Sequence, residues 1–215
     1  MATSTRIELR DRRRRRREES ERAILDAAER LLRERPFRDL TLEDVMAAAG
    51  QSRTAFYRHF DDRQGLVIRL LSDVGAELLE NSATWFAGSG DPRVEGRAAM
   101  TSLVEIWEQH GPLLRAISEA ASYDEEVERA YNDLVQIFID ATVARVERDL
   151  STGRIDVDVP DVREMAVALC WMTERYLVVN FGKPGGIDRT TAIEVLHTVW
   201  MRGMYRFEPI KPDAP

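Results

Sequence analysis

The fold is decided by the stretch LTLEDVMAAAGQSRTAFYRHF, which runs from Leu40 to Phe60. Thr41, followed three residues later by Asp44, approximates a capping box and predicts that a helix begins there. Gly50 predicts a tight turn, and Ser52 is a typical cap for a second, short helix. Two short helices joined by a turn of about three residues that contains glycine form the helix-turn-helix pattern, whose second helix can enter the DNA major groove.

Helices are also predicted on both sides of this stretch. Between Ser20 and a stop signal at Pro36, apolar residues recur at intervals of three and four, which is typical of an amphipathic helix. After the motif, Asp61 or Asp62 can cap a fourth helix that is expected to run to about Phe86. The sequence therefore predicts a three-helix head, residues 20–66, followed by a connecting helix.

The rest of the chain is expected to be a helical body, residues 67–207. After a Gly- and Pro-containing linker at 88–92, the pattern predicts helices near 94–110, 112–122, 124–151, 161–181 and 189–206, with a break at Gly111-Pro112. No alternation typical of a strand persists beyond about five residues. The predicted fold is all-α with about nine helices, a disordered Arg-rich arm at 1–19 and a flexible tail at 208–215.

The amino-acid composition is typical of a globular protein and not of a membrane-spanning or disulfide-bonded one. The chain has 215 residues, of which 32% are charged and 44% hydrophobic, as expected of a globular protein. Its longest strongly apolar run, Met165 to Met172, is far shorter than the ~20 residues of a membrane helix, so no membrane partner is expected. The single cysteine, Cys170, excludes an intramolecular disulfide. No secretion signal is recognisable at the start, so the cytoplasm is the expected compartment.

Catalytic and metal-binding patterns are not found in the sequence. His59, His110 and His197 fall on three different predicted helices, and none has a His or Cys partner at the spacing of metal ligands. No phosphate-binding glycine loop follows a predicted strand, and no Gly-x-Ser-x-Gly motif occurs. We therefore expect neither an enzyme nor a resident cofactor or metal.

Charge is distributed unevenly along the chain. Residues 1–70 contain 17 Lys and Arg against 13 Asp and Glu, whereas the whole chain has a net charge of −7. A basic front on an acidic body suggests that the front binds a polyanion. The unbroken run from Arg12 to Arg17 is open to three interpretations: an arm on DNA, a site for anionic lipid or RNA, or a solvated tail.

Residues 20–70 resemble the DNA-binding head of the TetR family of bacterial repressors. That family reads from a Thr through Ala-Ala-Gly-Val-Ser to Tyr-x-His-Phe and a Lys three residues later; here Gln51 replaces the Val and Arg63 the Lys. The resemblance implies that Thr41, Tyr57, His59 and Arg63 contact phosphates, although Tyr57 and His59 could instead pack the head. At the start of the second motif helix, Arg and Thr can contact guanine and thymine edges. The predicted DNA-binding set is Thr41, Ser52, Arg53, Thr54, Tyr57, Arg58, His59 and Arg63.

The body resembles the EthR subgroup of that family through residues 168–177 and 197–205, which read ALCWMTERYL and HTVWMRGMY. The resemblance implies a long apolar channel, although an aromatic stripe at helical spacing is also typical of plain core. Cys170 and Thr173 stand where the subgroup commonly has two Asn, so the ligand is expected to be less polar or differently anchored. The predicted ligand-binding residues are Leu103, Trp107, Tyr131, Leu134, Val135, Phe138, Thr142, Cys170, Thr173 and Trp200.

The same resemblance implies a homodimer through the eighth and ninth predicted helices, 161–181 and 189–206. Glu174 and Arg175, inside an otherwise apolar helix, should be paired or lie at an interface. The resulting hypothesis is a repressor that binds a near-palindromic operator on double-stranded DNA and is released by a small hydrophobic effector. Two alternatives remain: an effector-independent activator or architectural DNA-binding dimer, and a helical dimer that uses the arginine run on membranes or RNA.

Overall fold

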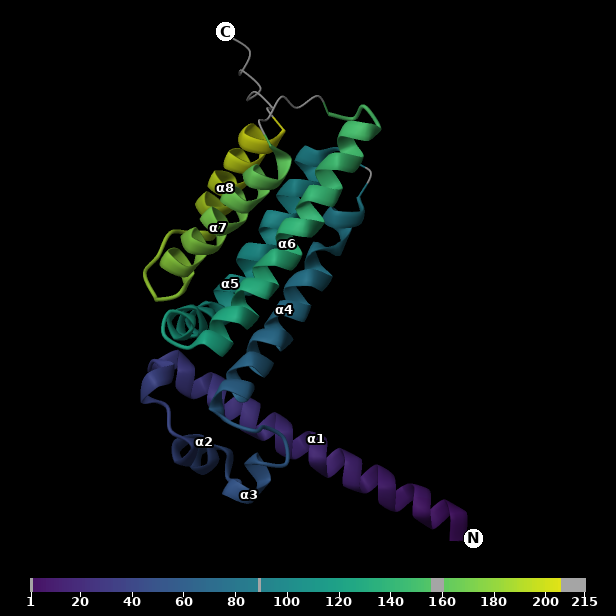
Figure 1. Ribbon diagram of the computed structural model, residues 1–215, viewed down its shortest axis with the longest axis vertical. Helices are drawn as coiled ribbons and strands as arrows, with labels where there is room; N and C mark the ends of the chain where they lie inside the picture. Colours follow the sequence, from purple (N-terminus) through teal and green to yellow (C-terminus); the bar gives the residue numbers. More distant parts are fainter. Residues whose placement is uncertain (1, 89, 156–160, 206–215) are drawn as a thin grey trace.

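The chain folds into a small head and a larger helical body that share one long helix. The computed structural model describes residues 2–88, 90–155 and 161–205, with side chains from Arg10 onward. These residues contain eight α-helices, one short 3-10 helix and no strand, which confirms the all-α prediction. The elements are α1 (Ala2–Glu34), η1 (Phe37–Asp39), α2 (Leu42–Ala49), α3 (Arg53–Phe56), α4 (Arg63–Ala87), α5 (Pro92–Ala121), α6 (Glu125–Ser151), α7 (Val162–Phe181) and α8 (Arg189–Met204). Figure 1 shows α4 crossing from the head into the body.

The head is built as the sequence predicts. The Thr41 hydroxyl accepts a hydrogen bond from the Asp44 amide, and the Asp44 carboxylate accepts one from the Thr41 amide, so the capping box at the start of α2 is complete. Gly50 ends α2 in the left-handed conformation, with φ 63°, which glycine adopts without steric cost. Ile24 of α1 and Phe56 of α3 are fully buried in the head core. Both side chains belong to the head core, in which α1 packs against α2 and α3.

The N-terminal arm differs from the prediction, because residues 2–19 continue α1 as a helix instead of being disordered. Arg and Glu are good helix formers, and Arg14 pairs along the helix with Asp11 at 3.8 Å and with Glu18 at 3.7 Å. Such i,i+3 and i,i+4 pairs offset part of the repulsion between neighbouring arginines. The run from Arg12 to Arg17 is therefore presented on a helix.

Aspartate caps start each helix from α4 onward. The side chains of Asp62, Asp91, Asp124, Asp161 and Asp188 each accept hydrogen bonds from amides in the first turn of the helix that follows. A carboxylate at this position satisfies free N–H groups and favours the positive end of the helix dipole. The caps therefore explain why the expected helix starts at 124, 161 and 189 fall within one residue of the observed ones.

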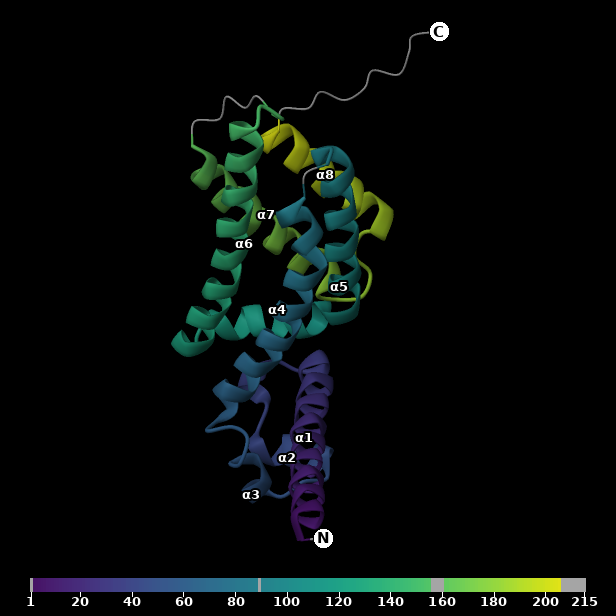
Figure 2. The ribbon, with the colours of Figure 1, turned by 90° about the vertical axis from the view of Figure 1, so that its right-hand side faces the viewer.

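The expected break at Gly111-Pro112 is a bend inside α5, so the prediction of two separate helices there is wrong and the helix count is eight among the described residues. Proline removes one backbone hydrogen bond and bends a helix without necessarily ending it. Figure 2 shows the last part of α5 lying across the lower edge of the body. A Cβ added at Gly111 would collide with the Phe181 carbonyl oxygen, so glycine permits α7 to approach this bend.

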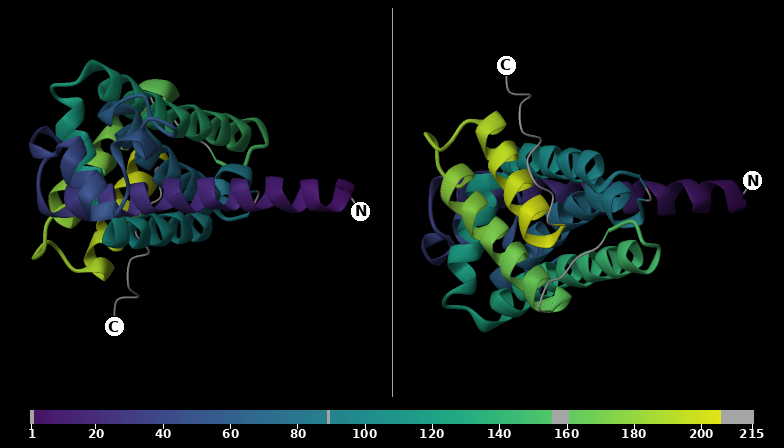
Figure 3. Two further views of the ribbon diagram at one scale, coloured as in Figure 1. Left: turned by 90° about the horizontal axis from the view of Figure 1, so that it is seen from below. Right: turned by 90° about the horizontal axis from the view of Figure 1, so that it is seen from above.

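In the body, the helices α6, α7 and α8 pack around α4 and α5. α4 packs against α5 and α6, α8 packs against α5, and α7 packs against α6. Viewed from above and below, these helices form a single group from which the N-terminal part of α1 projects (Figure 3). The predicted flexible tail at 208–215 lies outside the described residues. None of the described helices is long and apolar enough to cross a membrane.

Candidate DNA-binding surface and internal cavity

The exposed side of α3 carries the polar residues that the sequence singled out. The Ser52 hydroxyl caps α3 by accepting a hydrogen bond from the Ala55 amide at 3.2 Å. Arg53 and Thr54 at its start are exposed, and so are Tyr57 and Arg58 directly after it. Ala55 and Phe56, in contrast, are buried in the head. The short helix therefore presents a continuous polar face to solvent.

Two acidic side chains already contact part of this surface. Arg53 pairs with Glu43 of α2 at 2.9 Å, and both side chains are about two-thirds exposed. The Thr41 hydroxyl donates to Asp44 at 2.7 Å, and this bond is the main reason that the pKa of Asp44 is lowered. Exposed pairs of this kind contribute little stability. Arg53 can therefore exchange its carboxylate for another anion at small cost.

His59 is buried against α1, and Arg63 lies partly buried against the head. The His59 side chain is only 2% exposed and faces Glu21 of α1, with 3.8 Å between Nδ1 and the carboxylate. α3 ends at Phe56, so the turn that follows directs His59 inward. This burial favours the packing interpretation of His59 over the predicted phosphate contact. Arg63 is half-buried; it donates to the Leu40 carbonyl and lies over the Phe37 ring.

The burial of His59 makes the stability of the head dependent on pH. Burial lowers the pKa of its imidazole below the usual 6.5, so the unfolded chain binds a proton more readily than the folded one. The folded state should lose stability as the pH falls below about 6.5. We expect His59→Gln to lose less unfolding free energy than the wild type between pH 7.5 and 5.5, as measured by urea denaturation. Equal losses would show that another group carries the effect.

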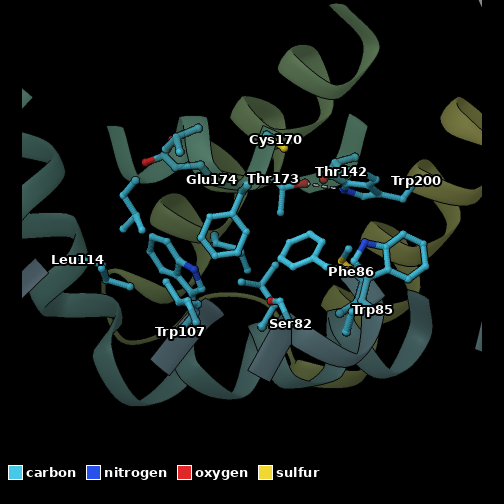
Figure 4. Close-up of a pocket in the computed structure, with 18 of the residues that line it drawn as sticks. Ser82, Trp85, Phe86, Trp107, Leu114, Thr142, Cys170, Thr173, Glu174 and Trp200 are labelled. Carbon is cyan, nitrogen blue, oxygen red and sulfur yellow. Dashed lines mark hydrogen bonds between the residues drawn. The ribbon is translucent and has the colours of Figure 1, made fainter. Parts of the chain in front are cut away.

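All ten predicted ligand-binding residues line one cavity inside the body. Its volume is about 130 Å³, and Figure 4 shows aromatic rings from several helices around it. α5 contributes Leu103 and Trp107, and Trp200 comes from α8. The other predicted wall residues are Tyr131, Leu134, Val135, Phe138 and Thr142 of α6 with Cys170 and Thr173 of α7. The helical spacings that placed these residues on common faces were correct.

The prediction missed the α4 wall of the cavity. Leu78, Ser82, Trp85 and Phe86 line it from this helix. Their spacings of four, seven and eight follow the helical repeat, which was a usable signal for a shared face. The spacing alone cannot tell which neighbouring helices that face meets. The remaining residues that the prediction missed are Ala99, Met100, Leu114, Glu174 and Leu177.

Polar groups in the cavity wall are few and mostly paired. The Trp200 indole N–H donates to the Thr173 hydroxyl at 2.8 Å in a buried bond (Figure 4). Burial raises the pKa of the Cys170 thiol to about 12, so this thiol stays protonated and is a poor thiol sensor. The cavity therefore offers mainly apolar contact to any molecule inside it.

Glu174 is the one acidic residue among the cavity-lining side chains of the described chain. Its carboxylate accepts a hydrogen bond from the Tyr131 hydroxyl at 2.5 Å and one from the Ser118 hydroxyl at 3.5 Å. Burial, followed by the charge of Glu174, raises the pKa of Tyr131 well above its usual value, which keeps Tyr131 a hydrogen-bond donor. The Glu174 carboxylate is thus satisfied by two hydroxyl groups, while Arg175 next to it is exposed.

A buried cluster of charged side chains packs against Trp85, a cavity-lining residue near the C-terminal end of α4. The Arg145 side chain is 0% exposed and pairs with Asp149 at 2.6 Å and with Glu95 at 2.8 Å. It also donates to the Trp85 carbonyl, and its guanidinium lies 4.6 Å from the centre of the Trp85 ring. Arg154 reaches Asp149 at 2.5 Å. This cluster fixes a tryptophan that lines the cavity.

Two family models match the sequence. The model described as bacterial regulatory proteins, tetR family, matches residues 24–70. The model described as the C-terminal domain of the transcriptional regulator EthR matches residues 96–206, just over half of the chain. The chain belongs to the TetR family, in its EthR-like group. The described residues contain no group of three or more His, Cys, Asp or Glu that could hold a metal ion.

Relatives of this TetR-family protein are transcriptional regulators. The regulator EthR of Mycobacterium tuberculosis is 27% identical over 191 residues, which are 87% of this chain and 88% of that protein. EthR of Mycolicibacterium smegmatis is 24% identical over 199 residues, 90% of this chain and 89% of that protein. Among solved structures, one similar protein is NalD of Pseudomonas aeruginosa, a secondary repressor of a multidrug efflux pump. Its TM-score is 0.69 at 25% identity, and the match covers 88% of this chain and 98% of NalD. Proteins of this family bind DNA through the helix-turn-helix head and typically form dimers.

Proposed function

We propose that this TetR-family regulator is a repressor released by a small hydrophobic effector. A homodimer binds a near-palindromic operator on double-stranded DNA through two copies of α3, and the effector binds in the cavity of the body. The observation that carries the proposal is the position of α4. This helix begins at Arg63, directly after the α3 region, and ends at Ala87 with four of its residues in the cavity wall.

On the DNA side, the residues at the start of α3 are suited to contact bases, and the exposed residues around them are suited to contact phosphates. Arg53 and Thr54 lie at the start of the helix, the end that usually reaches base edges in the major groove. Arginine can bond to guanine O6 and N7, and a threonine methyl can contact the thymine methyl. Tyr57, Arg58 and Thr41 are exposed around them and suit phosphate oxygens, which position the head without reading sequence.

On the effector side, the size and chemistry of the cavity suggest how release occurs. An engineered apolar cavity of about 150 Å³ holds a benzene ring, so the 130 Å³ found here accommodates only a small apolar group. A longer effector must push neighbouring helices apart, and α4 is one of them. The backbone at Gly75 of α4 lies close to Leu134 of α6. Displacement of α4 would change the spacing of the two heads, provided that the effector binds the displaced form more tightly.

The second copy of the chain is proposed to pack on α7 and α8. Val179 of α7 is 64% exposed, and Val195 and Val199 of α8 are 38% and 37% exposed. These apolar side chains lie on the two helices that the EthR resemblance assigns to the dimer seam. A twofold dimer of this kind places two copies of α3 on one side of the assembly, which fits a near-palindromic site.

A substitution that fills the cavity should weaken the release of the protein from operator DNA by an effector, without weakening operator binding itself. In Thr173→Trp the larger side chain occupies cavity space, while α3 is unchanged. With linear alcohols from 1-butanol to 1-decanol as probes, we expect the longer alcohols to release the wild type from operator DNA. For Thr173→Trp, we expect the concentration for half-release to rise about tenfold or more, with operator affinity within about threefold of wild type; fluorescence anisotropy measures both.

The matched control is Thr152→Trp, which introduces the same side chain at an exposed threonine at the end of α6, outside α3, the cavity wall and the proposed dimer helices, and should behave as the wild type. If the two variants respond alike, the cavity is not the effector site. If operator binding by the wild type is indifferent to all the alcohols, the effector-independent activator or architectural alternative is favoured.

A further inference from the structure

The N-terminal part of α1 carries arginines that the proposed function does not use. Arg10 and the run from Arg12 to Arg17 are all exposed. Among these described side chains only Arg14 pairs with carboxylates, those of Asp11 and Glu18. The others hold full positive charges at the protein surface, which is the usual electrostatic signature of a phosphate-binding surface.

Three contacts define the side of α1 that faces the α3 region. The Arg17 guanidinium donates to the Arg58 carbonyl at 3.4 Å, and the Ser20 hydroxyl donates to the Gln51 side chain at 3.3 Å. Glu21 faces His59 at 3.8 Å. These positions on α1 are three and four residues apart, so they share one helix face.

The same face continues toward the N-terminus through Arg13 and Arg10. Arg13 lies four residues and Arg10 seven residues before Arg17, and an α-helix brings such positions into line. Arg12 and Arg15 point to the opposite side by the same periodicity. The N-terminal part of α1 therefore has an inner row of arginines, Arg10, Arg13 and Arg17, on the side that faces α3. Arg12 and Arg15 form an outer row on the opposite side.

The inner row extends the α3 surface along the molecule. Arg58, whose carbonyl accepts the hydrogen bond from Arg17, is itself exposed in the turn directly after α3. Figures 1 and 2 show that the N-terminal end of α1 reaches beyond α3, at the end of the molecule opposite the helical body. From Arg17 to Arg10 the helix rises by about 10 Å, a span comparable with a few base pairs of duplex DNA.

We infer that Arg10, Arg13 and Arg17 bind phosphates of the double-stranded DNA next to the base pairs contacted by α3. The inference rests on the proposed DNA-binding function of α3. Guanidinium groups match phosphate geometry and stay charged at all physiological pH values. Because the contacts are to phosphate, this row lengthens the bound site without reading its sequence. An ordered helix restricts the contact to one side, which a disordered polycation would not do.

A pair of double variants with equal charge tests the inference. Arg13→Gln with Arg17→Gln removes two inner charges, and Arg12→Gln with Arg15→Gln removes two outer ones; glutamine preserves the helix. The slope of log K for operator binding against log salt concentration falls by about 0.9 for each phosphate that the protein no longer neutralises. For the four inner arginines of a dimer we expect the slope to fall by about 3 to 4, and for the outer variant to stay at the wild-type value. Circular dichroism checks the helix content of both.

A shortened DNA fragment provides the second measurement. On an operator trimmed to the base pairs protected by α3, the inner variant and the wild type should have the same slope. Equal reductions of slope in the inner and outer variants would overturn the inference in favour of an unoriented polycation. No reduction in either, or a reduction only in binding to anionic vesicles or RNA, would also overturn it. If the wild type itself binds no specific site, the proposed function fails and the inner row fails with it; intact operator binding with an unchanged slope rejects the inner row alone.

Discussion

Replacing Arg145 with methionine is expected to lower the free energy of unfolding by about 3–5 kcal/mol, the usual effect of removing one member of a buried ion pair. Asp149 is fully buried and would lose its 2.6 Å partner, although Arg154 would still neutralise part of its charge. For a chain of this length the decrease corresponds to a fall in Tm of roughly 10 °C. Urea denaturation followed by circular dichroism measures it.

Arg148→Met is the matched control for this prediction. Arg148 lies on the same helix and also donates to an α4 carbonyl, that of Phe86 at 2.9 Å, but its side chain is exposed. Its replacement should cost less than about 1 kcal/mol. If both substitutions have the same small effect, the Arg145 cluster does not stabilise the α4 end of the cavity.

Arg53→Ala is expected to reduce operator affinity by about a hundredfold or more. A bidentate contact to a base contributes about 1–3 kcal/mol, and a dimer loses two of them. Affinity for unrelated DNA should fall much less, because that binding depends on phosphate contacts. Fluorescence anisotropy with operator and random duplexes separates the two effects.

Arg22→Ala removes the same charge from the head at an exposed position on the far side of α1, and it should leave operator affinity within about threefold. An Arg53 variant that weakens operator and random DNA equally would make Arg53 a phosphate contact instead of a base contact.

The parts of the fold that follow local rules could be predicted from the sequence. The Thr41–Asp44 capping box, the left-handed Gly50 and the Ser52 cap depend on neighbouring residues, so the helix-turn-helix was visible in one short stretch. Pro112 correctly marked where α5 bends, but the prediction that one helix ends there and another begins was wrong. Whether a proline ends or bends a helix depends on the packing around it, here the approach of α7 to Gly111.

The parts that depend on tertiary contacts could not be predicted in the same way. His59 has a polar side chain in a polar stretch, and its burial follows only from where α1 crosses α3. Arg145 lies in a helix of mixed character, and nothing local marks it as fully buried. The ten cavity residues were found because helical spacing placed them on common faces and a family resemblance indicated which faces to join. The α4 wall was missed because neither source connected α4 to them.

The most direct test of DNA recognition by α3 is a footprint of the purified protein on the DNA that flanks its own gene, at near-physiological salt. Regulators of this kind often control themselves or a neighbouring gene. The account predicts a protected, near-palindromic segment whose protection is lost in Tyr57→Ala and kept in Arg22→Ala. A footprint that Tyr57→Ala leaves intact, or weak binding along the whole fragment that disappears as salt is raised, would contradict it.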